Sequence, residues 1–465
     1  MIEPQLTLPG VEVYIGDAKE TVMKLAEKYG GKVNMVCTSP PYKGLRRYLP
    51  PGHPDADKEI GQELTVEEYI ASLCDLFDAI GRNLLTETGS LWINQGDSYA
   101  GSGGAGGDYA KGGLREGQPK WKPPKSDFPA KCLQMVPERF ALEMIRRGWI
   151  LRNRVIWFKG KDVDDPLDDD DGGAPASNGM PTSVEDRLKN TYEVVFHFTK
   201  QQRYFYDLNA IREPLIHPEA VDGTRMFGGA NKHDGYGTRT HSGNPYGRRN
   251  GTVPTGLEND ETKGQPSGIA GASPLGRNPG DLWAIPTTPF PLAHFATYPP
   301  ALVHRPAKTT CPEAVCIKCG TPRQAIYETK EIARARPYRN SDGRHPRREV
   351  SSGQMDASDK TGLNVIKGAH IIGYTDCECN VGWGGAVVLD PFFGSGSTAQ
   401  GVFEARLPVT IDGHYCQPLV IGIDLDERNL SIIEKRLTGR AKQSRKIDYK
   451  QYGGGLFELL EDDAR

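Results

Sequence analysis

A glycine turn between an apolar strand and a helix, near the carboxyl end of the chain, is the feature that most constrains the fold. The stretch "VVLDPFFGSGSTAQGV" carries Gly394 and Gly396 in this turn, where glycine lets the backbone bend tightly and approach a ligand. It lacks the third glycine of the dinucleotide pattern and the lysine of a P-loop. The next apolar strand, "VIGID", ends at Asp424, where a carboxylate can accept hydrogen bonds from ribose hydroxyls. Together these elements predict an α/β sheet that binds a nucleotide-like cofactor.

The first half of the chain alternates between strand and helix patterns. Apolar runs typical of strands are present at 11–15, 33–37, 89–99 and 149–159. Helical spacing is clearest at 66–84. Segments 191–200 and 204–208 predict two short strands that form a hairpin. Such alternation is typical of an α/β fold.

Composition narrows the class of protein further. The chain has 465 residues, 37% hydrophobic and 25% charged, so it is globular and long enough for one large domain with insertions or for two domains. Its 55 glycines and 35 prolines predict long loops, and segments 100–128, 162–179 and 215–280 lack apolar periodicity. No apolar run reaches about 18 residues and no leader pattern is visible, so we expect a cytoplasmic protein without a membrane span.

The formal net charge of −3 argues against a uniformly basic, histone-like surface. A local nucleic-acid groove is still compatible with it, because binding depends on where lysine and arginine gather. The short clusters "GLRRY" and "GRRN" are the basic stretches of this kind, and each is equally well explained as solvated surface.

A second unusual stretch, "TSPPY" at 38–42, follows the apolar strand 33–37. Two consecutive prolines fix φ and remove two backbone donors, so the carbonyl of Pro40 is held in one direction. Tyr42 follows at once. The stretch predicts a rigid loop that presents a hydroxyl, a carbonyl and an aromatic ring at the end of a strand. The alternative is a simple strand terminator followed by a core tyrosine.

"TSPPY" together with "LDPFFGSGST" resembles the S-adenosylmethionine-dependent amino methyltransferases that act on exocyclic amines in DNA. The SPPY stretch precedes the glycine turn, which is the motif order of the β class of that family. The resemblance implies a Rossmann-like class I methyltransferase fold, with a mostly parallel central sheet, a terminal antiparallel hairpin and a loop-rich recognition insertion. It also implies S-adenosylmethionine as cofactor and double-stranded DNA as substrate, with the target base extruded from the duplex.

The same resemblance implies roles for individual residues. Catalytic roles fall on Ser39, Pro40, Pro41 and Tyr42. Ser39 and the Pro40 carbonyl would hold the target amine, and Tyr42 would stack on the base. The resemblance assigns cofactor binding to Asp17, Thr38, His294, Phe295, Thr297, Asp390, Pro391, Phe392, Gly394, Gly396, Ser397, Thr398 and Asp424. Two of these have a simpler alternative, since Asp17 can cap the following helix and Phe295 can belong to the core.

The serine of SPPY resembles the cytosine-N4 members of the family more than the adenine-N6 members, which more often carry Asp or Asn there. We therefore expect methylation of cytosine N4, with adenine N6 as the alternative. Two further alternatives are a DNA-binding module without catalytic activity and an amino methyltransferase of RNA or protein. The intact SPPY and glycine motifs argue against the first, and their order along the chain argues against the second.

Five of the nine cysteines gather in two groups, "CPEAVCIKCG" and "DCECN". A C-x-x-C pair followed by a second close pair is zinc-ribbon spacing, and paired cysteines in a cytoplasmic protein favour metal over disulfides. We expect one structural zinc bound by Cys316, Cys319, Cys377 and Cys379, with Cys311 outside the site. Free thiols are the alternative.

These motifs divide the chain into five expected regions. They are a catalytic half at 1–214, a target-recognition region at 215–282, a cofactor-binding helix segment at 283–310, a zinc-ribbon-like insertion at 311–384 and a cofactor-binding half at 385–465. The family resemblance also allows a restriction endonuclease counterpart and a homodimer. The DNA sequence that the protein recognises does not follow from these residues, because no groove-reading helix is recognisable.

Overall fold

The computed structural model describes residues 2–45, 47–49, 52–101, 128–160, 184–214, 273, 275–287, 297–335 and 363–439. The expected loop segments 100–128, 162–179 and 215–280 lie almost entirely outside this part of the chain. Two compact units are present. The larger unit contains Met1–Ile211, Gly280–Gln324 and Thr375–Ile447, and the smaller one contains Arg212–Pro279, Ala325–Tyr374 and Asp448–Arg465.

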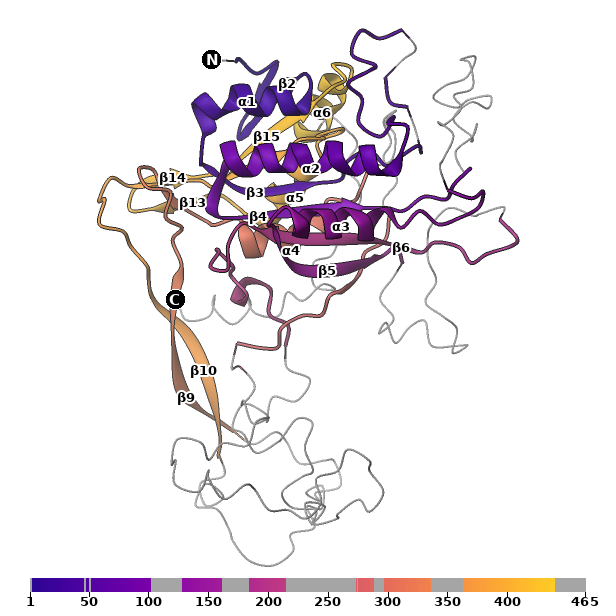
Figure 1. Cartoon of the computed structure of the whole chain (residues 1–465). Coiled ribbons are helices and arrows are strands. Elements are labelled where there is room, and N and C mark those ends of the chain that lie inside the picture. The colour runs from indigo at the N-terminus through magenta and orange to yellow at the C-terminus, as the bar shows by residue number, and fades with distance from the viewer. Residues whose placement is uncertain are drawn as a thin grey trace, which may run out of the picture. The chain divides into compact units, whose positions relative to one another are not determined.

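A nine-stranded sheet with the order β1-β2-β15-β12-β3-β4-β6-β5-β7 forms the centre of the larger unit (Figure 1). Its strands are β1 (Leu6–Leu8), β2 (Val11–Ile15), β3 (Val33–Thr38), β4 (Leu85–Gln95), β5 (Ile150–Phe158), β6 (Tyr192–Thr199), β7 (Leu282–Ala284), β12 (Val387–Asp390) and β15 (Leu419–Asp424). From β2 through β15, β12 and β3 to β4 all neighbours are parallel. β1 is antiparallel to β2, and β6 is antiparallel to both β4 and β5.

Helices cover both faces of this sheet. They are α1 (Ala18–Tyr29), α2 (Val66–Asn83), α3 (Val136–Arg146), α4 (Ala301–Thr310), α5 (Ser397–Ala405) and α6 (Asn429–Leu437), with a short 3₁₀ turn, η2, at Asn209–Ile211. One core cluster joins the sheet to α1, α2 and α3, and a second joins its other face to α4, α5 and α6. A mostly parallel sheet with helices on both faces confirms the expected Rossmann-like α/β architecture.

Local sequence explains why these elements form. Every residue of β3 is buried, as expected for a strand covered on both faces. In α2, Thr65 and Glu68 form a reciprocal capping box, and Tyr69, Leu73 and Phe77 follow at a spacing of four residues and are fully buried. These two elements fix the segment between them, which carries the SPPY loop, at the carboxyl edge of the sheet.

The expected hairpin is only partly correct. The strand at 191–200 is present as β6, but no strand forms at 204–208, and β6 pairs instead with β5 and β4. The backbone of 204–208 is used elsewhere, because Phe205 N donates to Thr88 O and Asp207 N donates to Thr309 O. The antiparallel pairs of the sheet are therefore β1–β2, β4–β6 and β5–β6.

Three small two-stranded sheets complete the described structure. β8 (Val315–Cys316) pairs with β11 (Trp383–Gly384), and β13 (Val409–Ile411) pairs with β14 (His414–Cys416) in the larger unit. In the smaller unit, β9 (Ala325–Ala335) and β10 (Leu363–Tyr374) form a long antiparallel ribbon. Among the described helices, none combines the length and the apolar character needed to span a lipid bilayer.

Candidate active site

The SPPY strand and the glycine-turn strand are neighbours in the sheet, although they lie far apart in the sequence. β15, β12 and β3 are adjacent and parallel, so their carboxyl ends meet at one edge. This edge carries Asp424, Asp390 and Thr38, the last residues of the three strands. The structure therefore brings the two halves of the predicted site together.

Asp390 is the buried centre of this edge, with 1% of its surface exposed. Its Oδ1 accepts a hydrogen bond from Thr38 Oγ1 at 2.6 Å and from Phe392 N at 3.0 Å. Its Oδ2 accepts from Thr398 Oγ1 and, at 3.4 Å, from Tyr298 Oη. Burial raises the pKa of this carboxyl, and the hydrogen bonds oppose that shift. Asp390 thus ties β3, β12 and α5 to the segment that precedes α4.

The glycine turn leads from β12 into α5. Gly394 and Gly396 have φ angles of 53° and 80°, in the left-handed region that favours glycine. Pro391 and Phe392 open the turn, and Ser397 is the first residue of α5. The turn has the backbone conformation that the sequence predicts.

Asp424 contacts the glycine turn directly. Its Oδ2 accepts from Gly394 N at 2.6 Å, and its Oδ1 accepts from Asp426 N at 2.8 Å and from Asn429 Nδ2 at 3.1 Å. Burial raises the pKa of this carboxyl to about 7. The carboxylate is therefore fixed in orientation beside the turn where a cofactor is expected.

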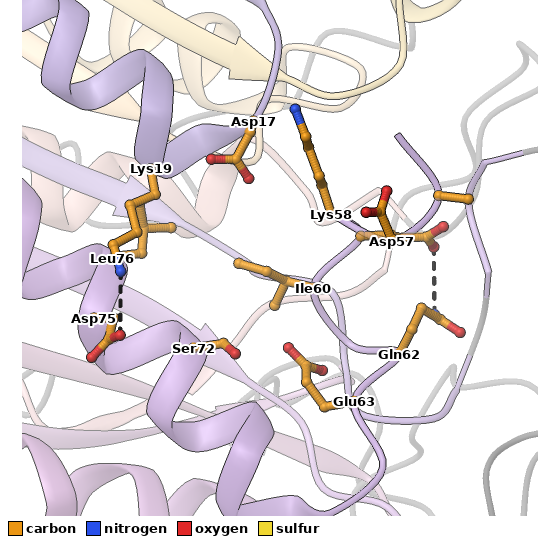
Figure 2. A pocket seen from close by; sticks show the side chains of 12 residues that line it. Asp17, Lys19, Asp57, Lys58, Ile60, Gln62, Glu63, Ser72, Asp75 and Leu76 are labelled. Atoms are coloured by element: carbon orange, nitrogen blue, oxygen red, sulfur yellow. Dashed lines mark hydrogen bonds and ion pairs between the residues drawn. The ribbon is translucent and has the colours of Figure 1, made fainter. Parts of the chain in front are cut away.

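The position of Asp17 is compatible with both roles considered from the sequence, helix capping and cofactor binding. Its Oδ1 accepts from Glu20 N at 2.8 Å and caps α1. It also lines a cavity of about 490 Å³ between the start of α1, the middle of α2 and the loop 56–63 (Figure 2). The cavity is lined by Asp17, Lys19, Ala56, Asp57, Lys58, Glu59, Ile60, Gln62, Glu63, Ser72, Asp75 and Leu76. Carboxylates outnumber lysines in this lining, which favours ligands that carry amino groups or positive charge.

The SPPY loop lies at the end of β3. Tyr69 of α2 donates from its Oη to the Pro41 carbonyl at 2.8 Å, and Gln95 Nε2 donates to Tyr69 Oη at 2.8 Å. No residue in the described part of the chain donates to the Pro40 carbonyl. Among the described residues the Pro40 carbonyl thus has no protein donor, and its role as an acceptor for the target amine stays a prediction.

Two residues of the site were not predicted from sequence. Asn94 Nδ2 lies 3.2 Å from Ser39 Oγ and 2.9 Å from Tyr42 Oη, and Tyr42 Oη donates to Glu193 Oε2 at 2.6 Å. Both are polar residues near the ends of apolar strands, at the edge where β3 ends. That placement is the sequence signal for them, but it requires knowing that β6 lies beside β4.

Gly96 makes room for the Tyr42 ring. A Cβ atom at position 96 would lie 2.4 Å from Tyr42 Cε2, closer than real Cβ contacts come. The aromatic ring is therefore packed directly on the backbone that follows β4, which fixes its position.

Of the remaining predicted cofactor-binding residues, Thr297 is described by the structure, and His294 and Phe295 are not. Thr297 lies directly before Tyr298, which contacts Asp390 and Thr398. His294 and Phe295 lie outside the described residues.

Four cysteines meet away from this site. The Sγ atoms of Cys316, Cys319, Cys377 and Cys379 all lie within 4.8 Å of one another. Cys311 is buried at the end of α4 and does not belong to this group. The set fits tetrahedral zinc, since Zn–S bonds of about 2.3 Å place sulfurs about 3.8 Å apart.

Comparison with known proteins places the chain in a family. The family model described as "DNA methylase" matches residues 33–317, which is more than half of the chain and includes the SPPY loop. The chain belongs to the DNA methylase family. The matched segment of this DNA methylase ends before the glycine turn.

Two Type II methyltransferases are among its relatives. M.SfiI of Streptomyces fimbriatus is 33% identical over 222 residues, which is 48% of this chain and 43% of M.SfiI. M.XycI of Xanthomonas campestris pv. cyanopsidis is 29% identical over 299 residues, 64% of this chain and 72% of M.XycI. The alignment thus spans less than half of M.SfiI. A solved structure, PvuII DNA methyltransferase (cytosine-N4-specific), aligns over 97% of this chain and 92% of that chain with 12% identity and a TM-score of 0.43.

Proposed function

We propose that this DNA methylase transfers a methyl group from S-adenosylmethionine to the exocyclic amine of an extruded base in duplex DNA, at cytosine N4. The observation that carries the proposal is the hydrogen bond between Thr38 and Asp390, which links the SPPY loop to the glycine turn within one buried edge. A loop that can hold an amine and a turn that can hold a cofactor are thereby side by side. The names of the Type II methyltransferase relatives agree with this activity.

The cofactor-binding roles follow from position. We assign the adenine ring to the cavity beside Asp17 and the ribose hydroxyls to Asp424. The methionine part lies along the turn at Gly394 and Gly396. His294, Phe295 and Thr297 stay predictions for the methionine part. Thr38, Asp390, Pro391, Phe392, Ser397 and Thr398 stay predictions for cofactor binding, with no part of the cofactor assigned. When bound, S-adenosylmethionine supplies an electrophilic methyl group on a sulfonium.

The catalytic roles follow from the poor nucleophilicity of the target. The lone pair of a base amine is delocalised into the ring, so acceptors that bind its hydrogens and stabilise developing positive charge favour reaction. Ser39 Oγ and the Pro40 carbonyl are these acceptors. Tyr42 holds the extruded base by stacking, which contributes about 1–3 kcal/mol per base in single-stranded complexes.

Cytosine is preferred over adenine because Ser39 occupies the first position of the motif, as in the cytosine-N4 members that it resembles. Adenine N6 is the second candidate. An inactive DNA-binding module is disfavoured by the joined SPPY and glycine elements. A restriction endonuclease counterpart, a homodimer and the target-recognition role of 215–282 stay predictions.

A labelled-methyl assay tests the substrate class. Purified protein is incubated with tritiated S-adenosylmethionine and, separately, duplex DNA of mixed sequence, total RNA and a protein extract. We expect label in DNA alone. Label confined to RNA or protein would contradict the proposed substrate.

We further propose that Cys316, Cys319, Cys377 and Cys379 hold one structural zinc, which would leave no open position for chemistry. Within the described part of the chain, the small core at these cysteines has four buried residues, Ala314, Cys316, Trp383 and Cys416, with Val409 and Ile411 packed against it. So small a core supplies little folding free energy, and metal binding supplies it in domains of this kind.

Replacing both Cys316 and Cys319 by serine is expected to abolish zinc binding and to expose the 311–324 segment to protease. Elemental analysis of protein purified without added metal should give about one zinc per wild-type chain. Cys132→Ser, at a cysteine outside the cluster, should retain the metal. A wild-type zinc content near zero would remove the metal site and leave the methyltransferase proposal intact.

A further inference from the structure

A buried polar network surrounds Ser39 and Tyr42. The register of the sheet pairs Thr38 with Ile93 and Asn94 with Val195, so the strands β3, β4 and β6 bring Ser39, Asn94 and Glu193 together. Asn94 is 3% exposed. Its Nδ2 lies 2.8 Å from Glu193 Oε2, in addition to its contacts with Ser39 and Tyr42. Lys159 forms an ion pair with the other oxygen of Glu193.

The carboxylate of Glu193 fixes the direction of these hydrogen bonds. An ionised carboxylate only accepts, so Asn94 must present its NH₂ group and Tyr42 its hydroxyl hydrogen to Glu193. The second hydrogen of the NH₂ group is shared between Tyr42 Oη at 2.9 Å and Ser39 Oγ at 3.2 Å. One lone pair of the Ser39 hydroxyl is thereby occupied, and its other lone pair remains available to a ligand.

The observed orientation of the Asn94 side-chain amide costs folding free energy. Its Oδ1 is buried and has no hydrogen-bond partner among the described residues. A buried acceptor without a partner destabilises the folded state. Rotating the amide would place Oδ1 against the Glu193 carboxylate, which is worse. The hydrogen bonds to Glu193 and Tyr42 offset part of this cost, and the contact with Ser39 gives the same amide a second role, the orientation of the Ser39 hydroxyl.

We infer that Asn94 is a positioning residue for methyl transfer, and that it acts as a hydrogen-bond donor that orients the Ser39 hydroxyl while Glu193 and Lys159 hold it in place. This inference rests on the proposed function, because Ser39 is the acceptor for the target amine. It requires a donor at position 94 specifically. A carboxylate there would accept the Ser39 hydrogen and leave Ser39 in a different orientation.

Asn94→Asp tests this requirement through pH. Aspartate at 94 would touch Glu193, and two carboxyls in contact raise the pKa of one of them. Below that pKa the pair carries one proton, and the ion pair between Lys159 and Glu193 favours its location on the carboxyl at position 94, which can then donate to Ser39. Above that pKa neither carboxylate can donate. We expect kcat of the variant to be about 10²-fold below wild type at pH 9 and to recover at least about tenfold relative to wild type at pH 6, with KM for the cofactor unchanged.

Two comparisons make the outcome decisive. Asn83→Asp on α2, where the amide donates to the Ala79 carbonyl, should follow the wild-type pH profile. Asn94→Ala introduces no charge and should lose activity equally at both pH values. If circular dichroism shows that Asn94→Asp does not fold, Asn94→Ala becomes the test. Any of three results would overturn the inference: full activity of Asn94→Asp at pH 9, a loss of activity in that variant that does not change with pH, or full activity of Asn94→Ala. Methyl transfer by the wild type would in each case still support the proposed function. No transfer by the wild type would overturn both.

Discussion

Replacing Ser39 by alanine is expected to lower kcat for methyl transfer by about 10²- to 10³-fold, while S-adenosylmethionine still binds. The substitution removes the hydroxyl that we propose as an acceptor for the target amine. It leaves the Thr38–Asp390 hydrogen bond and the contact between Gly394 and Asp424 in place, because Ser39 takes part in neither. Calorimetry with the cofactor and single-turnover transfer of a labelled methyl group to DNA measure the two effects separately.

Ser431→Ala is a suitable control for this variant. Ser431 is an exposed serine on α6 whose hydroxyl donates to the Arg428 carbonyl, so its loss should leave kcat unchanged. Full activity of Ser39→Ala would leave the Pro40 carbonyl as the only acceptor and would refute the role given to Ser39.

Replacing Gly394 by valine is expected to weaken S-adenosylmethionine binding by about 10²-fold. Its φ of 53° strains any β-branched residue, and strain of this kind costs about 1–3 kcal/mol. Relief of the strain would move the backbone N–H that donates to Asp424 and thereby displace the carboxylate assigned to the ribose. A valine side chain would also occupy space that we assign to the methionine part of the cofactor. Calorimetry of cofactor binding gives the affinity.

Gly413→Val separates this local effect from general loss of stability. Gly413 has a φ of 79° in the β13–β14 turn, and its Cβ would meet no atom within 4 Å. The two variants therefore carry similar backbone strain at different places. Equal cofactor affinity in both variants would show that the glycine turn has no particular role in binding.

The parts of the fold that are set by local sequence could be predicted. The apolar run of β3 predicts a strand buried on both faces, and it is one. The glycine turn predicts positive φ angles, because no other residue adopts them at so little cost. The meeting of Thr38 with Asp390 follows from two motifs of one family, although 352 positions separate them.

The parts that depend on strand order could not be predicted. The segment 204–208 has an aromatic strand pattern, yet its backbone bonds to Thr88 and Thr309, so tertiary contacts override the local preference. Asn94 forms part of the site because β4 pairs with β3, and Glu193 because β6 inserts beside β4. No spacing along the chain relates Glu193 to Ser39, so its polar position in an apolar strand indicates the contact only once the strand order is known.

The central claim, amino methylation of cytosine in DNA, is tested most directly by the product. Duplex DNA is incubated with the protein and S-adenosylmethionine that carries a deuterated methyl group, digested to nucleosides and measured by mass spectrometry. We predict deuterated N4-methylcytosine. Deuterated N6-methyladenine as the only product would agree with amino methylation of DNA and would contradict cytosine as the target base. Absence of any deuterated nucleoside, under conditions in which the cofactor is bound, would contradict the account.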